Sequence, residues 1–203
     1  MAKFKDGLFG PVSGKIDNLI LSSRNGKPYV RSRPAQVSNP RSPKQLANRK
    51  KLSLLSGFLK QAKTMIAAGF PAPPEGKSSR DAAYSANYPT AFKGEYPNIT
   101  LNYAGLIVSK GNKPLPQNIA ISVHDTGLTL SWETTETGFL RIFILREQDQ
   151  AGFTSLRNIE LAACQADLAL PAGFILEPQK VHLWISAASY SGTSVSVSHY
   201  QHL

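Results

Sequence analysis

The clearest pattern of apolar positions lies in the first third of the chain. From Leu52 to Ile66, apolar side chains recur every three or four residues, which is the spacing of one buried helix face. Just before them, Ser42-Pro43-Lys44-Gln45 offers a capping residue, a proline suited to the first helical position and a glutamine able to close a capping box. The pattern predicts an amphipathic helix of about seven turns that starts at Pro43. The positions expected to be buried are Leu52, Leu55, Phe58, Leu59, Ala62, Met65 and Ile66.

A β-hairpin is predicted before this helix. Residues 15–23 and 27–33 both have strand-like composition, and they flank Arg24-Asn25-Gly26. An Asn-Gly pair between two such segments is a strong hairpin signal. Arg31 and Arg33 are expected on one face of the second strand, because side chains alternate along a strand. Residues 1–14 are expected to form an extended arm, since the apolar residues there stand between glycines and polar residues.

The pattern changes after residues 69–80, which are rich in Pro, Gly and Ser and are interpreted as a boundary. A short helix is expected over 81–92 and a strand over 99–108. From residue 119 onward, short strands are predicted between turns, with Leu128, Leu130 and Trp132 alternating with polar residues and Val195 and Val197 alternating with serines. The predicted strands cover residues 119–123, 128–133, 139–146, 155–161, 181–189 and 194–200.

This alternation predicts an antiparallel sheet or sandwich, and the order of the strands resembles a fibronectin-type or immunoglobulin-like β-sandwich. The expected fold class is therefore α+β, mainly β. Three parts are predicted: a basic arm, hairpin and helix module at 1–70, a connector with short strands at 71–118, and the β-sandwich at 119–203.

Charge separates the first part from the remainder. The chain has 203 residues and a formal net charge of +10. Residues 1–70 contain 14 Lys and Arg against two Asp, whereas residues 71–203 contain 9 against 11 acidic residues. This asymmetry predicts an acidic partner for the first part, either nucleic acid, a membrane surface or an acidic patch on a neighbouring subunit. The candidate basic partner-binding face consists of Arg31, Arg33, Arg41, Arg49, Lys50, Lys51, Lys60 and Lys63.

The sequence offers no pattern typical of an active site, a metal site or a cofactor site. It has no phosphate-binding glycine loop and no GxSxG motif. His199 and His202 are three residues apart beside the C-terminus, and they are interpreted as surface residues rather than a metal site. Glu133 and Glu136 are the closest candidate acid and base, but a strand end and a turn are expected to hold them. Cys164 is the only cysteine, which excludes an intrachain disulfide, and it is expected to be a small buried side chain.

Four segments, taken in order, resemble a family of short basic proteins of unknown function found in Bacteroidota. They are FKDGLFGPVSGKIDNLILSSRNGKPYVRSRP, NPRSPKQLANRKK, GEYPNITLNYAGLIVSKG and VHLWISAASYSGTSVSVSHY. The resemblance spans nearly the whole chain and implies no activity. The element NPRSPKQLANR is also loosely similar to an element of phage-like and virion-associated proteins. This likeness alone suggests a role in particle assembly.

Two main functions follow from these observations. The first is a non-enzymatic structural protein that self-assembles into a filament, sheath or virion-like particle through the basic module and an assembly arm of Phe4, Leu8, Phe9 and Val12. The second is a nucleic-acid-binding protein that uses the basic module. A third, a carbohydrate- or peptide-binding module using Trp132 or Trp184, depends on fold analogy alone.

No secretory signal and no apolar run of the roughly 18 residues needed to span a membrane are visible. We therefore expect a protein without a membrane span that is cytoplasmic, exported by a route without a signal, or carried in a particle.

Overall fold

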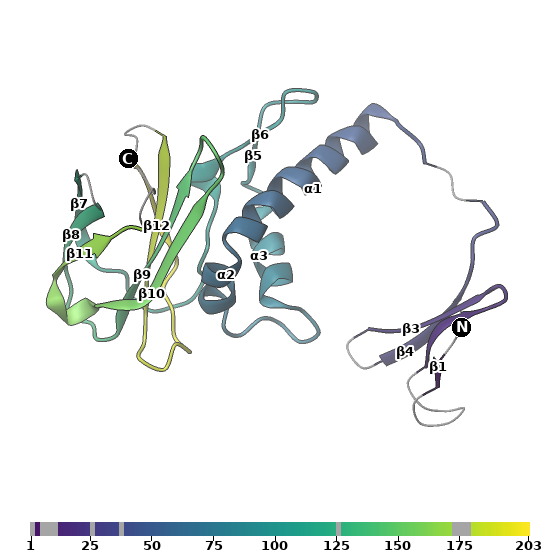
Figure 1. The fold of residues 1–203 in the computed structure, drawn as a ribbon, viewed down its shortest axis with the longest axis horizontal. Coiled ribbons are helices and arrows are strands. Elements are labelled where there is room, and N and C mark those ends of the chain that lie inside the picture. The colour runs from purple at the N-terminus through teal and green to yellow at the C-terminus, as the bar shows by residue number, and fades with distance from the viewer. Residues whose placement is uncertain (1–2, 5–11, 25–26, 37–38, 125–126, 172–179) are drawn as a thin grey trace. The chain divides into compact units, whose positions relative to one another are not determined.

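The computed structural model describes residues 3–4, 12–24, 27–36, 39–124, 127–171 and 180–203 (Figure 1). The chain divides into two compact units, Met1–Ser42 and Pro43–Leu203. The part of the chain that the structure describes is 39% strand and 23% helix, so the expected mainly β class is confirmed.

The first unit is a four-stranded antiparallel sheet, here called the N-terminal sheet. Its strands lie in the order β1 (Lys3–Phe4), β2 (Val12–Ile16), β3 (Leu19–Arg24) and β4 (Lys27–Ser32). β3 and β4 pair from Leu19–Ser32 to Arg24–Lys27, which confirms this part of the predicted hairpin. The Asn25-Gly26 turn itself lies outside the described residues.

One strand was predicted over residues 15–23, but the structure divides it. Asp17 and Asn18 form a turn between β2 and β3, and Asp17 has a left-handed φ of 47°. Asp and Asn adopt this conformation more readily than most residues because their short side chains bond to the local backbone. The sequence Lys-Ile-Asp-Asn-Leu-Ile therefore holds a second hairpin, which was missed.

The predicted long helix starts at Pro43 as expected but is divided in two. α1 covers Pro43–Gln61 and α2 covers Lys63–Gly69. Ala62 departs from helical geometry with a ψ of 11°, although its amide still donates to the Phe58 carbonyl oxygen at 3.0 Å.

Six of the seven positions that were expected to be buried are buried, and the prediction for Leu52 is wrong. Leu52 is 52% exposed, whereas Leu55 and the later positions contact the core. The helical period identifies the apolar face of a helix but does not identify the turn at which the core begins.

A third helix, α3 (Ser79–Asn87), follows the Pro-rich segment. The Ser78 hydroxyl accepts a hydrogen bond from the Asp81 amide, and the Asp81 carboxylate accepts one from the Ser78 amide. This capping box starts the helix earlier than the expected residue 81 and accounts for its first turn.

The described residues of the second unit form three antiparallel sheets. A four-stranded sheet has the order β10-β9-β12-β13, a three-stranded sheet has the order β11-β8-β7, and β5 pairs with β6. The strands are β5 (Phe92–Lys93), β6 (Thr100–Leu101), β7 (Gln117–His124), β8 (Gly127–Glu133), β9 (Phe139–Arg146), β10 (Gly152–Glu160), β11 (Gln165–Ala169), β12 (Val181–Ala188) and β13 (His199–His202). The strands predicted over 119–123, 128–133, 139–146, 155–161 and 181–189 are confirmed within a few residues at each end.

The four-stranded sheet lies between two other layers, as Figure 1 shows. On one face, Leu140, Ile142 and Ile144 of β9 share a core with Leu128 and Leu130 of the three-stranded sheet. On the opposite face, alternate residues of β9 and β12 meet the helices. Since both faces are covered, all eight residues of β12 are buried.

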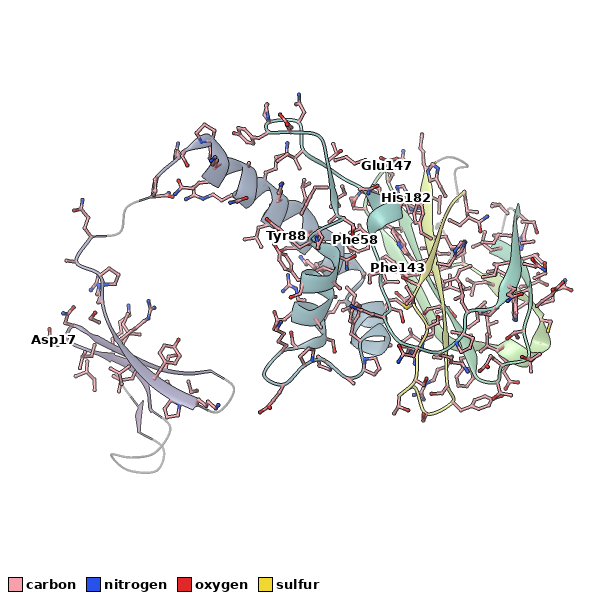
Figure 2. All side chains as sticks on the ribbon, turned by 180° about the vertical axis from the view of Figure 1, so that it is seen from behind. Asp17, Phe58, Tyr88, Phe143, Glu147 and His182 are labelled. Atoms are coloured by element: carbon pink, nitrogen blue, oxygen red, sulfur yellow. The ribbon has the colours of Figure 1, made fainter. Side chains whose placement is uncertain are left out.

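The helices belong to the core of this second unit. Phe58 of α1 packs against Phe143 of β9, with ring centroids 6.2 Å apart (Figure 2), and against Trp184 of β12 at 5.3 Å. The sequence-based division at residues 69–80 groups this helix with the N-terminal strands. The apolar face of α1 instead contacts the four-stranded sheet. Along the chain, the boundary between the two compact units falls between Ser42 and Pro43.

Two other expected strands are corrected. In the segment 99–108 only Thr100–Leu101 forms a strand, and Tyr103–Gly105 forms a 3₁₀ turn. In the last segment β13 begins only at His199, while Val195 is buried in an isolated bridge to Ala188 and Val197 is 48% exposed. β11 was not predicted.

Candidate partner-binding surfaces

One face of the N-terminal sheet, here called the cationic face, carries a row of positive charge. Lys15 pairs with Ile20, and Ile20 pairs with Arg31, so these three side chains lie across neighbouring strands on the same face. Lys27 and Tyr29 lie on this face as well, because they alternate with Arg31 along β4. All three cations are exposed, and none makes an ion pair within the described residues.

The opposite face of the same sheet, here called the apolar face, carries aliphatic side chains. Ile16 pairs with Leu19, and Leu21 pairs with Val30, while Pro28 lies further along β4. Ile16, Leu19 and Val30 are 44%, 47% and 59% exposed. An apolar sheet face is normally buried against another layer. Among the described residues of the first unit there is no such layer.

The predicted cations of the first unit are only partly brought together. Arg31 lies on the cationic face, and Arg33 follows β4, where its backbone amide donates to the Asn18 carbonyl oxygen at 2.7 Å. Arg41 lies in the exposed segment before α1.

The predicted cations of the helix are in two groups. Arg49 and Lys60 of α1 and Lys63, the first residue of α2, are exposed. The break at Ala62 places Lys63 on a different helix from Arg49 and Lys60.

Lys50 and Lys51 have partners inside the second unit. The Lys50 ammonium donates to the Pro97 carbonyl oxygen at 2.6 Å. The Lys51 ammonium lies 5.5 Å from the centre of the Phe92 ring, within the range of a cation–π contact. Both lysines therefore help to hold the segment around β5 and β6 on α1.

The expected assembly arm is described only at its ends. Lys3–Phe4 and Val12–Ser13 pair with each other as β1 and β2, so these ends belong to the N-terminal sheet. Leu8 and Phe9 lie outside the described residues.

Lys15 and Lys27 were missed as members of the charged surface. Alternation along β4 places Lys27 with Arg31, and this signal was present in the sequence. Placing Lys15 on this face requires the turn at Asp17 and Asn18, because the turn sets the register in which Lys15 pairs with Ile20 of β3.

A comparison with protein families covers nearly the whole chain. The model of a family described as "Family of unknown function (DUF6266)" matches residues 11–202. The chain belongs to this family. No curated protein matches it. The expected resemblance to a family of unknown function is confirmed, while the Bacteroidota source and the likeness to virion-associated proteins stay predictions.

Within this DUF6266 member, His182 is a buried histidine to which the sequence pattern assigned no role. It is 6% exposed, and its ring stacks on Tyr103 at 3.8 Å, while Nδ1 lies 2.8 Å from the Tyr200 hydroxyl. Burial, followed by the nearby charge of His202, lowers the pKa of His182 from 6.5 to about 4. His182 is therefore neutral at pH 7. Figure 2 labels it on the sheet beside Glu147.

The other candidate reactive groups are Cys164 and the pair Glu133 and Glu136, which line one pocket. Cys164 is exposed rather than buried, because it ends a 3₁₀ turn in the left-handed conformation with a φ of 55°. Glu136 pairs with Lys113 at 2.6 Å, and Glu133 accepts a hydrogen bond from Asn118 at 2.8 Å. No group of three or more His, Cys, Asp or Glu side chains suited to a metal ion occurs in the described part of the chain.

The two tryptophans are core residues. Trp132 is 3% exposed and donates from its indole nitrogen to the Leu161 carbonyl oxygen at 2.8 Å. Trp184 is fully buried and donates to the Leu106 carbonyl oxygen at 2.8 Å. Neither ring offers a surface for a sugar or a peptide. Among the helices described, none is long and apolar enough to span a membrane.

Proposed function

We propose that this chain is a non-enzymatic structural protein that self-assembles through its N-terminal sheet. The observation that carries the proposal is the apolar face, where Ile16, Leu19 and Val30 are exposed beside the half-buried Leu21. The second unit already has two closed cores, one on each side of the four-stranded sheet. The first unit has only one layer among its described residues, and a partner that covers its apolar face supplies the missing layer.

A second copy of the chain is the partner that we propose. In an isologous pair, two apolar faces pack against each other and each contributes the same residues. The cations lie on the opposite face, so this packing does not bring them together. β4 is at the edge of the sheet, and its backbone groups can pair with a further strand from a neighbour. Face packing combined with edge pairing extends into a filament, sheath or particle.

The test compares the full chain with a chain that lacks residues 1–42. Sedimentation velocity over a range of concentrations is expected to show association of the full chain. The shortened chain is expected to be a folded monomer, because its cores do not include the first unit. Equal association of both chains, with unchanged circular dichroism, contradicts the proposal.

A second candidate function is nucleic-acid binding, and the cationic face favours it. Lys15, Lys27 and Arg31 lie on one exposed sheet face together with Tyr29, an aromatic ring on which a base can stack. Cations without carboxylate partners on such a face are suited to phosphate contacts. A gel-shift titration of the monomeric chain distinguishes this function from assembly.

We also propose that the two packed sheets of the second unit are related to fibronectin-type or immunoglobulin-like sandwiches. The support is their antiparallel strands, their shared core and the buried Trp132 between them. Strand-by-strand superposition of an experimental structure on such a sandwich tests this relation.

A further inference from the structure

The second unit contains a buried arginine that is distant in sequence from the N-terminal sheet. Arg141 is on β9, on the side that faces the helices, and is 3% exposed. Its Nη1 donates to the Ala68 carbonyl oxygen at 2.8 Å, close to the C-terminal end of α2. A cation at this end of a helix is favourable. This contact accounts for one nitrogen only, because Nε is buried and has no hydrogen-bond partner.

A second guanidinium converges on the same place. A Cβ atom placed on Gly192 would lie 3.1 Å from Arg141 Nη2 and 4.0 Å from Arg157 Nη2. The two nitrogens are therefore no farther apart than the sum of these distances. Arg157 is an exposed residue of β10, in the irregular segment between Ser155 and Ile159. The two side chains thus reach one point from separate strands.

No carboxylate within the described residues compensates this pair of like charges. Neither Arg141 nor Arg157 forms an ion pair in the part of the chain that the structure describes. Burial, and then the charge of Arg157, lower the pKa of Arg141. Two adjacent cations, one of them buried, are unfavourable unless an anion neutralises them.

A hydroxyl group adds to the donors at this place. Ser186 pairs with Arg141 across β12 and β9, so the two side chains share a face. Ser186 is fully buried and its Oγ has no hydrogen-bond partner. Buried polar groups are nearly always paired, so an unpaired hydroxyl beside an unpaired guanidinium nitrogen indicates that a polar group is missing.

We propose that Arg141 and Arg157 bind a tetrahedral oxyanion, namely a phosphate or sulfate group. A guanidinium presents a planar fork of donors that matches such oxygens, and two forks neutralise a doubly charged group. The anion bridges Nη2 of Arg157 and Nη2 of Arg141 beside Gly192. A glycine is required here both because its φ is 77° and because a side chain would fill the space in front of Arg141.

The proposal goes beyond self-assembly, and its residues lie in the second unit alone. Arg157→Gln is the informative variant, because Arg157 is exposed and its loss does not open the core. Arg80→Gln is the matched control, since Arg80 is an exposed arginine on α3. A third variant, Gly192→Ala, closes the space directly but strains the backbone, so it is interpreted only if it folds with an unchanged circular dichroism spectrum.

The full chain is titrated with sodium phosphate and with glycerol phosphate by calorimetry, in sodium chloride at matched ionic strength. Binding by the wild type and by Arg80→Gln, with at least tenfold weaker binding by Arg157→Gln, supports the site. Binding of glycerol phosphate as well as phosphate identifies an esterified group as a ligand, whereas binding of phosphate alone identifies the free anion. Equal affinity in all variants, or no heat with the wild type, overturns the proposal.

Discussion

Two substitutions on the apolar face, Leu19→Ser with Val30→Ser, test self-assembly most directly. These residues are 47% and 59% exposed, so about half of each side chain remains to be buried by a partner. Complete burial of a Leu or Val side chain stabilises by about 1.5–3 kcal/mol, which leaves about 1 kcal/mol for each residue at the interface.

In a two-fold pair each residue occurs twice, so the double variant removes about 4 kcal/mol of association free energy. Every 1.4 kcal/mol changes a dissociation constant about tenfold, and the expected loss is therefore close to a factor of about 1,000. Sedimentation equilibrium over three decades of concentration measures this change.

The control is Tyr29→Ser on the cationic face of the same sheet. Tyr29 is 45% exposed, so the control removes a comparable apolar surface from β4 without touching the apolar face. A normal dissociation constant in the control together with a large loss in the double variant identifies the apolar face as the interface. If the double variant associates as strongly as the wild type, the reasoning is refuted.

Three further predictions concern stability and charge. Phe58→Ala is expected to destabilise the second unit by about 3–5 kcal/mol in urea unfolding, because Phe58 is fully buried, whereas Leu52→Ala on the exposed turn of α1 should cost well under 1 kcal/mol. The pKa of His182 in the folded chain is depressed to about 4, so the unfolded chain binds a proton at a higher pH than the folded chain does. The free energy of unfolding should therefore fall by up to about 1.4 kcal/mol per pH unit as the pH drops from 6.5 toward 4. His182→Phe should flatten this pH dependence, and an unchanged slope in that variant contradicts the prediction. If the cationic face binds duplex DNA, replacing Lys15, Lys27 and Arg31 together with Gln should change the salt dependence of binding. The slope of log affinity against log salt concentration should become shallower by about 3 units, and an unchanged slope excludes contacts of these residues with phosphates.

Local signals were sufficient for most elements of the fold. The apolar run of β9 begins after Gly138 and ends in charged residues, and its predicted limits match Phe139–Arg146. Pro43 marks the start of α1 because it suits the first helical turn and no later one. Such signals depend only on neighbouring residues, so they are visible without the tertiary structure.

Features that depend on distant contacts were not predictable. Leu52 continues the helical apolar period, yet the core begins one turn later, at Leu55. Val195 was expected in a regular strand, but it is buried through a bridge to Ala188 outside β13. These outcomes depend on which segments the three layers bring together, and the local pattern does not contain that information.

The candidate surface shows the same division. Arg31 and Arg33 were placed on one face by alternation along a single strand, but the row from Lys15 to Arg31 required the register of three strands. The convergence of Arg141 and Arg157 depends on an irregular segment of β10, and no spacing in the sequence indicates it.

The two faces of the N-terminal sheet also decide how assembly and nucleic-acid binding relate to each other. Because side chains alternate along each strand, packing two apolar faces together turns both cationic faces outward. An assembled particle would then present the cations of every subunit, and linked weak sites bind a long polyanion far more tightly than one site does. Loss of association through Leu19→Ser and Val30→Ser would therefore weaken DNA binding although no charge is changed. If DNA affinity instead stays constant while association is lost, the cationic face binds nucleic acid as a monomer, and the second candidate function becomes the primary one.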